Sequence, residues 1–387
     1  MKRRIKIVHL ITGVGNGGAE RSLVQLVEGL DSNRFECVVV TLAKDQCFYQ
    51  QRIEKACKLY SLEARQGWLF FTKIFALYKI IKKENPDILQ TWLYHADLIG
   101  IVLGKLIGVK RILWNVHSTL LPSSVTPKST ILIRKINAWL SRFTTGIINC
   151  SKKSIREHIR IGYSPEKFIY IPNGYDCRAY YPINFTLRDT FKISPDDFVI
   201  GVVGRFHPVK DHLNFLQSLV FIKAKFPSIK ALLVGKNIDK SNTMLMNFII
   251  QNDLNDNVVL LGERSDLLNL YNTLDMLVLS SISEAFPNVI AEAMACGKPC
   301  VVTDVGDAAY IVAETGIVVP TRNPKLLADG VLQMIAFGKD RIAEQGKSAR
   351  NRIIQNFSLD KMIQSYNDLY LGLIISSRGL VVMKNGN

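Results

Sequence analysis

Short apolar runs alternate with helix-like segments along this chain, and the alternation occurs twice. Each run has the length and near-continuous hydrophobicity of a strand buried in a parallel sheet. In the first half the expected strands are Ile5–Ile11, Glu36–Leu42, Ile88–Trp92, Arg111–Val116 and Gly146–Asn149. In the second half they are Phe198–Val203, Lys230–Val234, Val258–Leu261, Met276–Leu279 and Pro299–Thr303. The pattern predicts two doubly wound, Rossmann-like α/β domains.

The junction between the two domains is expected in Ile171–Pro195, where prolines and Asn-Gly interrupt any regular period. A last helix is expected at Leu359–Leu373, packing back on the first domain, with a frayed tail after it. The expected domains are therefore 1–180, 181–358 and a C-terminal segment at 359–387. A cleft is expected between the two large domains.

The charge of the chain is unevenly distributed. The chain has 49 Lys and Arg against 33 Asp and Glu, a net charge of +16, and residues 1–180 hold 28 of the basic and 13 of the acidic residues. Leu98–Arg156 contains no Asp or Glu. Such a field attracts nucleic acid, anionic lipid headgroups or phosphorylated substrates, and a merely solvated basic surface stays open as the alternative.

Seven cysteines are scattered without a C-x-x-C pair, which predicts neither a disulfide framework nor a zinc site and fits a reducing cytoplasm. The basic start Lys2-Arg3-Arg4 imitates a signal peptide, but polar residues interrupt the apolar run that follows, so a buried strand is expected there. No stretch reaches the roughly 18 apolar residues of a spanning helix. Any membrane contact is therefore expected to be peripheral.

A glycine-rich turn, Gly13–Arg21, joins the first expected strand to a helix. Such a turn lets backbone amides approach a phosphate. It also matches the dinucleotide fingerprint, but the second strand closes before Asp45 and lacks the acid that would bind a ribose. A phosphate or acceptor site is favoured, with a dinucleotide site or a purely structural turn as alternatives.

Two cations follow the first strand of the second half. Arg205 and Lys210 lie just past Val203, at the sheet edge where α/β proteins bind ligands. Fixed cations at this edge suit a diphosphate and can assist its departure. The alternative is a pair of surface cations in a loop.

The most specific motif is Ser280–Pro299, with carboxylates at Glu284 and Glu292. Pro287 disfavours helix before it, so Glu284 is expected in a loop and a helix is expected to begin near Asn288. The two carboxylates could accept hydrogen bonds from two points of one extended ligand, while the first helical amides bind an anionic oxygen. Ordinary acids at a helix N-terminus are the alternative.

These motifs together resemble the retaining glycosyltransferases of family 4, which have the GT-B fold. The resemblance rests on Gly17-Gly18-Ala19-Glu20-Arg21, Asn173-Gly174-Tyr175-Asp176, Gly204-Arg205 with Lys210, Glu284 with Glu292, Ala293–Pro299 and Thr303–Gly306. It extends from about Ile5 to Tyr370. Ala285–Asn288 departs from the Gly-Phe-Gly of many members and is similar to enzymes of bacterial surface polysaccharide assembly, such as O-antigen or capsule.

The resemblance implies roles for residues of the second domain. Arg205 and Lys210 would hold the donor diphosphate, Glu284 a hydroxyl of the donor sugar, and Glu292 the nucleotide ribose. The backbone near Glu263 and Arg264 would contact the base. The other expected donor contacts are Phe286, Pro287, Asn288 and Val289.

The resemblance also implies roles for the first domain. Gly17 and Gly18 would approach the donor from the opposing domain, and His117 would lie close to the donor sugar. The expected catalytic residues are His117, Arg205, Lys210 and Glu284. Ser151 is interpreted mainly as a helix N-cap, although a donor contact stays open.

The expected reaction transfers a hexose or N-acetylhexosamine from a nucleotide diphosphate sugar, UDP-sugar being favoured, to a hydroxyl of a glycan or lipid-linked oligosaccharide with retention of configuration. No D-x-D occurs, so neither a metal nor a cofactor is expected. The alternatives are a GT-B nucleotide-sugar epimerase and a nicotinamide-dependent oxidoreductase. A nucleic-acid partner is not expected, because no recognisable binding module is present.

A membrane-bound acceptor would explain the basic first half. Pro127–Phe143 combines apolar and basic residues and could lie at a membrane interface, with an ordinary packed helix as the alternative. We therefore expect a peripheral enzyme on the cytoplasmic face of the membrane. The sequence indicates no oligomeric state.

Overall fold

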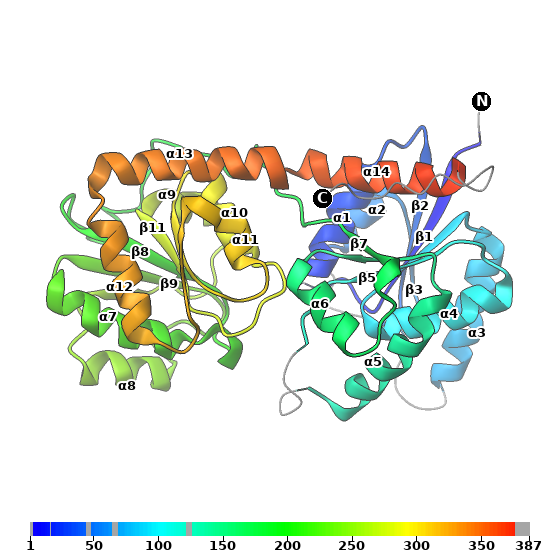
Figure 1. Cartoon of the computed structure of the whole chain (residues 1–387), viewed down its shortest axis with the longest axis horizontal. Helices are drawn as coiled ribbons and strands as arrows, with labels where there is room; N and C mark the ends of the chain where they lie inside the picture. Colours follow the sequence, from blue (N-terminus) through cyan, green and yellow to red (C-terminus); the bar gives the residue numbers. More distant parts are fainter. Residues whose placement is uncertain (1–2, 16, 44–47, 64–68, 121–125, 376–387) are drawn as a thin grey trace. The chain divides into compact units, whose positions relative to one another are not determined.

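The computed structural model describes residues 3–15, 17–43, 48–63, 69–120 and 126–375 (Figure 1). The described residues form two compact units, one from 1–174 with 359–375 and one from 175–358. The boundary lies before Tyr175, ahead of the expected residue 180, because the Tyr175 amide donates to the Phe357 carbonyl oxygen at 2.9 Å within the second unit. The expected tail after residue 375 lies outside the described residues.

The sheet of the first unit has seven parallel strands in the order β3-β2-β1-β4-β5-β6-β7. The strands are β1 Ile5–Ile11, β2 Phe35–Thr41, β3 Lys58–Ser61, β4 Ile88–Trp92, β5 Ile112–Val116, β6 Gly146–Asn149 and β7 Phe168–Tyr170. Two of them, β3 and β7, were not expected from the sequence. They are short, partly exposed edge strands, so they lack the continuous apolar run that marks the central ones.

Helices cover both faces of this sheet (Figure 1). They are α1 Gly18–Gly29, α2 Gln50–Ala56, α3 Leu69–Glu84, α4 Tyr94–Ile107, α5 Lys128–Leu140, α6 Lys152–Arg160 and α14 Leu359–Ile375, with short 3-10 turns at Ser141–Phe143 and Pro165–Lys167. Along β1, Ile7 and Ile11 pack in one core cluster with α1 and α14, whereas Val8 and Leu10 pack in another with α3 and α4. The side chains of β1 thus point alternately toward the two helical layers that cover the sheet.

The terminal helix α14 belongs to the first unit. The Tyr366 hydroxyl accepts a hydrogen bond from Asn115 Nδ2 at 2.6 Å, and the Tyr370 hydroxyl donates to Gln90 Oε1 at 2.5 Å. Both tyrosines are buried. These bonds satisfy one buried amide atom each in β5 and β4, Asn115 Nδ2 and Gln90 Oε1, which would otherwise be costly to bury.

The second unit has a six-stranded parallel sheet in the order β10-β9-β8-β11-β12-β13. Its strands are β8 Phe198–Val203, β9 Ile229–Val234, β10 Val258–Leu260, β11 Met276–Leu279, β12 Cys300–Thr303 and β13 Ile317–Val319. Its α-helices are α7 His212–Lys225, α8 Thr243–Gln251, α9 Leu267–Thr273, α10 Asn288–Ala295, α11 Ala308–Val312, α12 Pro324–Ile335 and α13 Gly338–Phe357, with short 3-10 turns at Pro208–Lys210 and Ala313–Thr315. The prediction of two doubly wound α/β domains is confirmed.

Candidate active site

The candidate residues of the second unit lie in loops at the carboxyl ends of β8, β11 and β12, where parallel α/β sheets bind ligands. Three hydrogen bonds hold these loops together. Ser280 Oγ donates to the Lys210 carbonyl oxygen at 2.9 Å, the Ile282 amide to Val209 O at 2.8 Å, and Thr303 Oγ1 to Ser281 O at 2.6 Å. The loop after β11 is therefore fixed from both sides before any ligand binds.

Lys210 and Glu284 form an ion pair inside this group of loops. Lys210 Nζ lies 2.6 Å from Glu284 Oε1, and Ser281 Oγ donates to the same oxygen at 2.7 Å. The two charged side chains are 22% and 14% exposed. Among the described residues no donor reaches Glu284 Oε2, which leaves this oxygen for a ligand hydroxyl.

Close backbone approaches shape the same loops. Gly306 has φ +52°, and a Cβ atom there would lie 2.3 Å from Glu284 O. Gly235 has φ +148°, and a Cβ atom there would lie 2.3 Å from Gly204 O. Asp307, next along the chain, has a φ of −98° that is open to any residue, and its amide donates to Ala285 O at 3.0 Å.

Arg205 lies in the same loop as Lys210 but points to solvent. Its side chain is exposed and forms no ion pair within the described part of the chain. The adjacent Phe206 amide donates to Lys236 O at 2.8 Å, which anchors the loop to the one that follows β9. An anchored loop with an exposed guanidinium can receive a phosphate oxygen without first breaking another contact.

Helix α10 begins at Asn288, as predicted from Pro287. Glu292 is 3% exposed and accepts a hydrogen bond from the Tyr271 hydroxyl at 2.7 Å. Burial raises the pKa of Tyr271 well above its usual range, so its hydroxyl remains a donor. The sequence pattern missed Tyr271, because it belongs to the ordinary helical segment α9.

The remaining donor candidates differ in how accessible they are. Phe286 is buried and stacks on Tyr175 with ring centroids 6.2 Å apart, so a contact from Phe286 to a ligand would come from its backbone. Asn288 Oδ1 accepts from the Tyr175 hydroxyl at 2.7 Å. In the loop after β10, Glu263 is exposed, whereas Arg264 is held by Asp266 in two hydrogen bonds of 2.8 and 2.6 Å.

In the first unit, His117 follows β5 and stacks on Trp92 with ring centroids 5.4 Å apart. Burial lowers the pKa of His117 to about 4, so the imidazole is neutral at pH 7. Trp92 Nε1 donates to His9 Nδ1 at 3.3 Å, which links the histidine pair through one indole. Sequence reasoning did not single out His9, although a histidine inside an apolar strand was a visible signal.

The glycine turn leads into α1. Gly17 has extended backbone angles at the N-cap, and a Cβ atom there would lie 2.2 Å from Glu20 Oε2. Gly18 is the first residue of the helix. At the start of α6, Ser151 Oγ accepts from the Ser154 amide at 3.0 Å, which confirms the N-cap interpretation.

The described residues contain no group of three His, Cys, Asp or Glu side chains that could hold a metal ion. No described helix is both long enough and apolar enough to cross a membrane. The six described cysteines are all free thiols, and Cys47 lies outside the described residues.

Comparison with known proteins agrees with this architecture. The family model described as Glycosyltransferase Family 4 matches residues 16–179, and the one described as Glycosyl transferases group 1 matches residues 197–336. A UDP-Gal:alpha-D-GlcNAc-diphosphoundecaprenol alpha-1,3-galactosyltransferase from Escherichia coli is 25% identical over 312 residues, covering 78% of this chain and 80% of the relative. The capsular polysaccharide biosynthesis glycosyltransferase CapM from Staphylococcus aureus is 27% identical over 328 residues, covering 80% and 83%.

Among solved structures, HepE from Anabaena in complex with UDP superposes with a TM-score of 0.82 at 22% identity, covering 94% of this chain and 99% of HepE. Two parallel-sheet domains and a site at the carboxyl ends of the strands define a glycosyltransferase of the GT-B fold. The chain belongs to glycosyltransferase family 4, as the sequence resemblance indicated.

Proposed function

We propose that this glycosyltransferase transfers a hexose or N-acetylhexosamine from a UDP-sugar to a hydroxyl of a lipid-linked glycan in bacterial surface polysaccharide assembly. The observation that carries the proposal is the Lys210–Glu284 ion pair of 2.6 Å beside the exposed Arg205. It offers cations for a diphosphate and a carboxylate oxygen for a sugar hydroxyl within one group of loops. The UDP and UDP-glucose complexes of HepE and the acceptor named for the Escherichia coli relative favour this choice of substrates.

In this proposal the charge of the leaving diphosphate is met by Arg205 and Lys210, without a metal ion. Charge develops on the phosphate oxygen as the sugar departs, and preorganised cations stabilise that charge most where water is excluded. Glu284 Oε2 accepts a hydrogen bond from a hydroxyl of the donor sugar, while Oε1 keeps Lys210 in place. Glu292 binds the nucleotide ribose.

We further propose retention of the anomeric configuration. The acceptor hydroxyl attacks from the face that the diphosphate leaves, the new C–O bond forms as the sugar–phosphate bond breaks, and a phosphate oxygen takes the hydroxyl proton. No side chain serves as nucleophile. Gly17, Gly18 and His117 of the first unit are further proposed substrate contacts, and the low pKa of His117 keeps its imidazole neutral.

The test is a transfer assay with UDP-glucose, UDP-galactose and UDP-N-acetylglucosamine, using a short-chain prenyl-diphosphate-linked N-acetylglucosamine as acceptor. We expect one donor to give a disaccharide whose proton NMR coupling reports an axial anomeric bond, as in the donor. An equatorial product bond would contradict retention. An epimerised or hydrolysed donor without a disaccharide would contradict the transfer itself.

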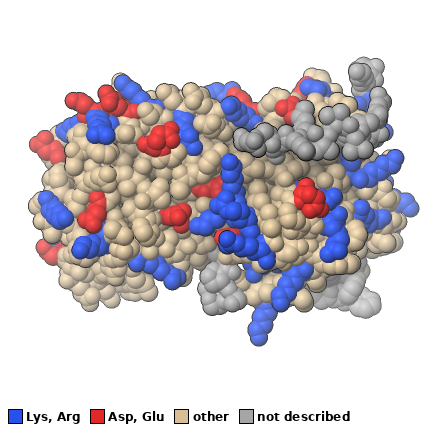
Figure 2. Space-filling view, in the orientation of Figure 1, with Lys and Arg blue, Asp and Glu red and all other residues tan. Residues whose placement is uncertain are grey.

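We also propose that the first unit binds the cytoplasmic membrane surface through α5. Leu132, Ile136 and Trp139 of α5 and Phe143 of the 3-10 turn that follows lie at helical spacing and are 58%, 38%, 57% and 45% exposed. The inner face of the same helix instead buries the polar Arg134 and Asn137. Figure 2 shows Lys and Arg prevailing over Asp and Glu on the visible face of the first unit. An exposed apolar row among basic residues suits an anionic lipid surface.

A further inference from the structure

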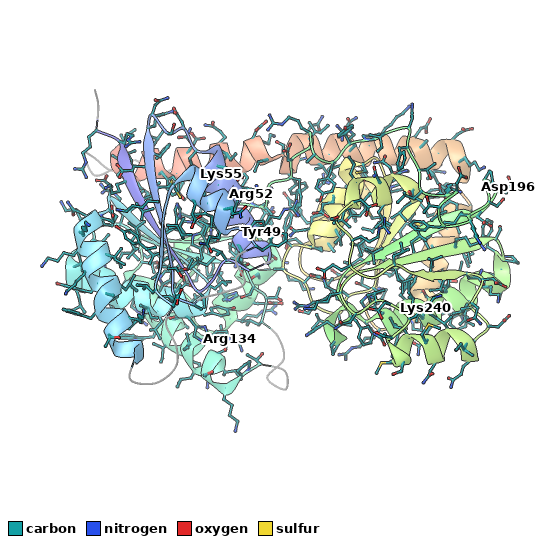
Figure 3. All side chains as sticks on the ribbon, turned by 180° about the vertical axis from the view of Figure 1, so that it is seen from behind. Tyr49, Arg52, Lys55, Arg134, Asp196 and Lys240 are labelled. Carbon is teal, nitrogen blue, oxygen red and sulfur yellow. The ribbon has the colours of Figure 1, made fainter. Side chains whose placement is uncertain are left out.

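Arg134 is a nearly buried cation on the inner face of α5 (Figure 3). Arg134 is 8% exposed, and its guanidinium carbon lies 5.9 Å from the ring centroid of Tyr94. Within the described part of the chain, no carboxylate forms an ion pair with it. An arginine taken from water without a counter-charge costs several kcal/mol, so its presence calls for a compensating partner.

The buried acid of the same cluster does not supply the missing charge. Asp97 is fully buried, and desolvation raises its pKa well above its usual range, which favours the neutral carboxyl. Its Oδ1 accepts a hydrogen bond of 2.5 Å from Thr91 Oγ1. Asp97 is bonded to Thr91 and forms no ion pair with Arg134, so the guanidinium has no charged partner among the described residues.

Two buried hydroxyl groups lie near this cation. Ser118 Oγ lies beside the Tyr94 hydroxyl and the Tyr163 hydroxyl lies beside Asn137, but neither forms a hydrogen bond of good geometry with a described residue. Each can donate a proton to a bound acceptor. Asn137 and His158 fix Tyr94 in place, by bonds of 2.8 Å to its carbonyl oxygen and its hydroxyl. Hydroxyl donors beside a cation match the acceptor oxygens of a phosphate.

The cluster lies where the acceptor side of the reaction is expected. Tyr94 opens α4 directly after β4, and Ser118 follows His117 at the end of β5. On the opposite face of α5 is the exposed apolar row described above. The helix thus presents lipid-compatible side chains outward and an uncompensated cation inward.

We propose that Arg134 binds a phosphate group of a lipid-linked acceptor, with the hydroxyls of Ser118 and Tyr163 as further donors. This inference rests on the proposed function, because it assumes an acceptor that carries a phosphate. It assigns the anion to the acceptor and not to a phospholipid headgroup.

The test measures binding of farnesyl diphosphate, a soluble prenyl diphosphate, to wild-type protein and to Arg134→Met by isothermal titration. We expect Arg134→Met to weaken binding about ten-fold or more, the scale of a lost bidentate charge-assisted contact. Lys135→Met is the matched control, because it removes the same charge from the exposed neighbour on the same helix. Its affinity should stay within about two-fold of wild type. Equal affinity of Arg134→Met and wild type would overturn the assignment.

Two further measurements separate the possible causes of a change. UDP titration should give the same affinity in wild type, Arg134→Met and Lys135→Met. If wild type fails to bind UDP, the proposed function fails; if all bind UDP and farnesyl diphosphate alike, only this inference fails. Arg134→Met should also be at least as heat-stable as wild type, because an uncompensated buried cation is removed. Marked destabilisation would instead indicate a structural arginine and overturn the proposal.

Vesicle flotation distinguishes the two sources of phosphate. Arg134→Met should bind phosphatidylglycerol vesicles like wild type, since the apolar row and the exposed basic residues are intact. Loss of vesicle binding with unchanged affinity for farnesyl diphosphate would assign Arg134 to lipid headgroups and contradict the proposal. Arg134→Lys keeps the charge without the planar fork and should bind farnesyl diphosphate with an affinity between those of wild type and Arg134→Met.

Discussion

A Cβ atom on Gly306 would lie 2.3 Å from the carbonyl oxygen of Glu284, so the loop after β12 approaches the Glu284 backbone too closely for any side chain. Gly306→Ala must push the two loops apart and also strains a backbone with φ +52°. We expect a loss of about 1–3 kcal/mol in the free energy of unfolding. We also expect weaker donor binding, because Glu284 moves.

Urea denaturation and UDP-sugar titration measure these two effects. Gly372→Ala is the matched control, since a Cβ atom at this glycine of α14 would meet nothing within 4 Å. It should leave donor binding unchanged. Unchanged stability and affinity in Gly306→Ala would mean that the Glu284 loop is not held as described.

The Lys210–Glu284 pair predicts a non-additive double mutant. Lys210→Met leaves a mostly buried carboxylate without its cation, and we expect a stability loss of about 2–4 kcal/mol. Glu284→Gln combined with Lys210→Met should recover most of that stability, because no uncompensated charge remains. Transfer activity should be lost in Lys210→Met, in Glu284→Gln and in the double mutant. Transfer activity in the double mutant would show that the reaction requires neither side chain, which contradicts the proposed mechanism.

His117 predicts a dependence of stability on pH. Its folded pKa is about 4, below the ordinary histidine value of 6.5, so the unfolded chain binds a proton first as the pH falls. The stability contribution of the neutral imidazole is full above pH 6.5 and is lost as the pH drops toward 4. In that window, a histidine with such a lowered pKa changes the free energy of unfolding by about 1.4 kcal/mol per pH unit.

His117→Gln should therefore be closer in stability to wild type at pH 5 than at pH 7, as measured by urea denaturation. His207→Gln, which replaces a histidine that is only partly buried, is the control substitution. An equal stability difference between His117→Gln and wild type at both pH values would show that His117 titrates normally in the folded protein.

The exposed row on α5 predicts membrane binding that depends on apolar contact as well as charge. Trp139→Glu should reduce flotation with phosphatidylglycerol vesicles by about ten-fold or more, while the melting temperature changes little, because the side chain is exposed. Phe221→Glu, at a similarly exposed position on α7 of the second unit, serves as control. Equal flotation of Trp139→Glu and wild type would exclude this face as the membrane contact.

The central strands were predictable because they are buried on both faces and leave an uninterrupted apolar run. β1, β4, β6, β8 and β11 begin and end as predicted. The edge strands were not predictable in this way. Lys58–Ser61 has polar, exposed ends, and Ile317–Val319 is only three residues long with an exposed centre, so neither forms the long apolar run of a central strand.

Candidate site residues were predictable where a motif imposes a local geometry. Pro287 set the start of α10, and glycines permitted the close approaches at Gly306 and Gly235. Partners from distant segments were not predictable, as Tyr271 beneath Glu292 illustrates. The same holds for Arg134, whose burial depends on Tyr94 and on packing between α4 and α5 that no local pattern encodes.

The most direct test of the account is nucleotide binding by the purified protein. Thermal shift with UDP, GDP, ADP, CMP and NAD should show stabilisation by UDP above the others, as expected for a ligand that binds only the folded state. Arg205→Ala and Glu292→Ala should abolish the shift, whereas Lys325→Ala, which removes an exposed cation from α12, should retain it. Stabilisation by NAD alone, or no response to any nucleotide, would contradict the assignment of these loops to a UDP-sugar donor.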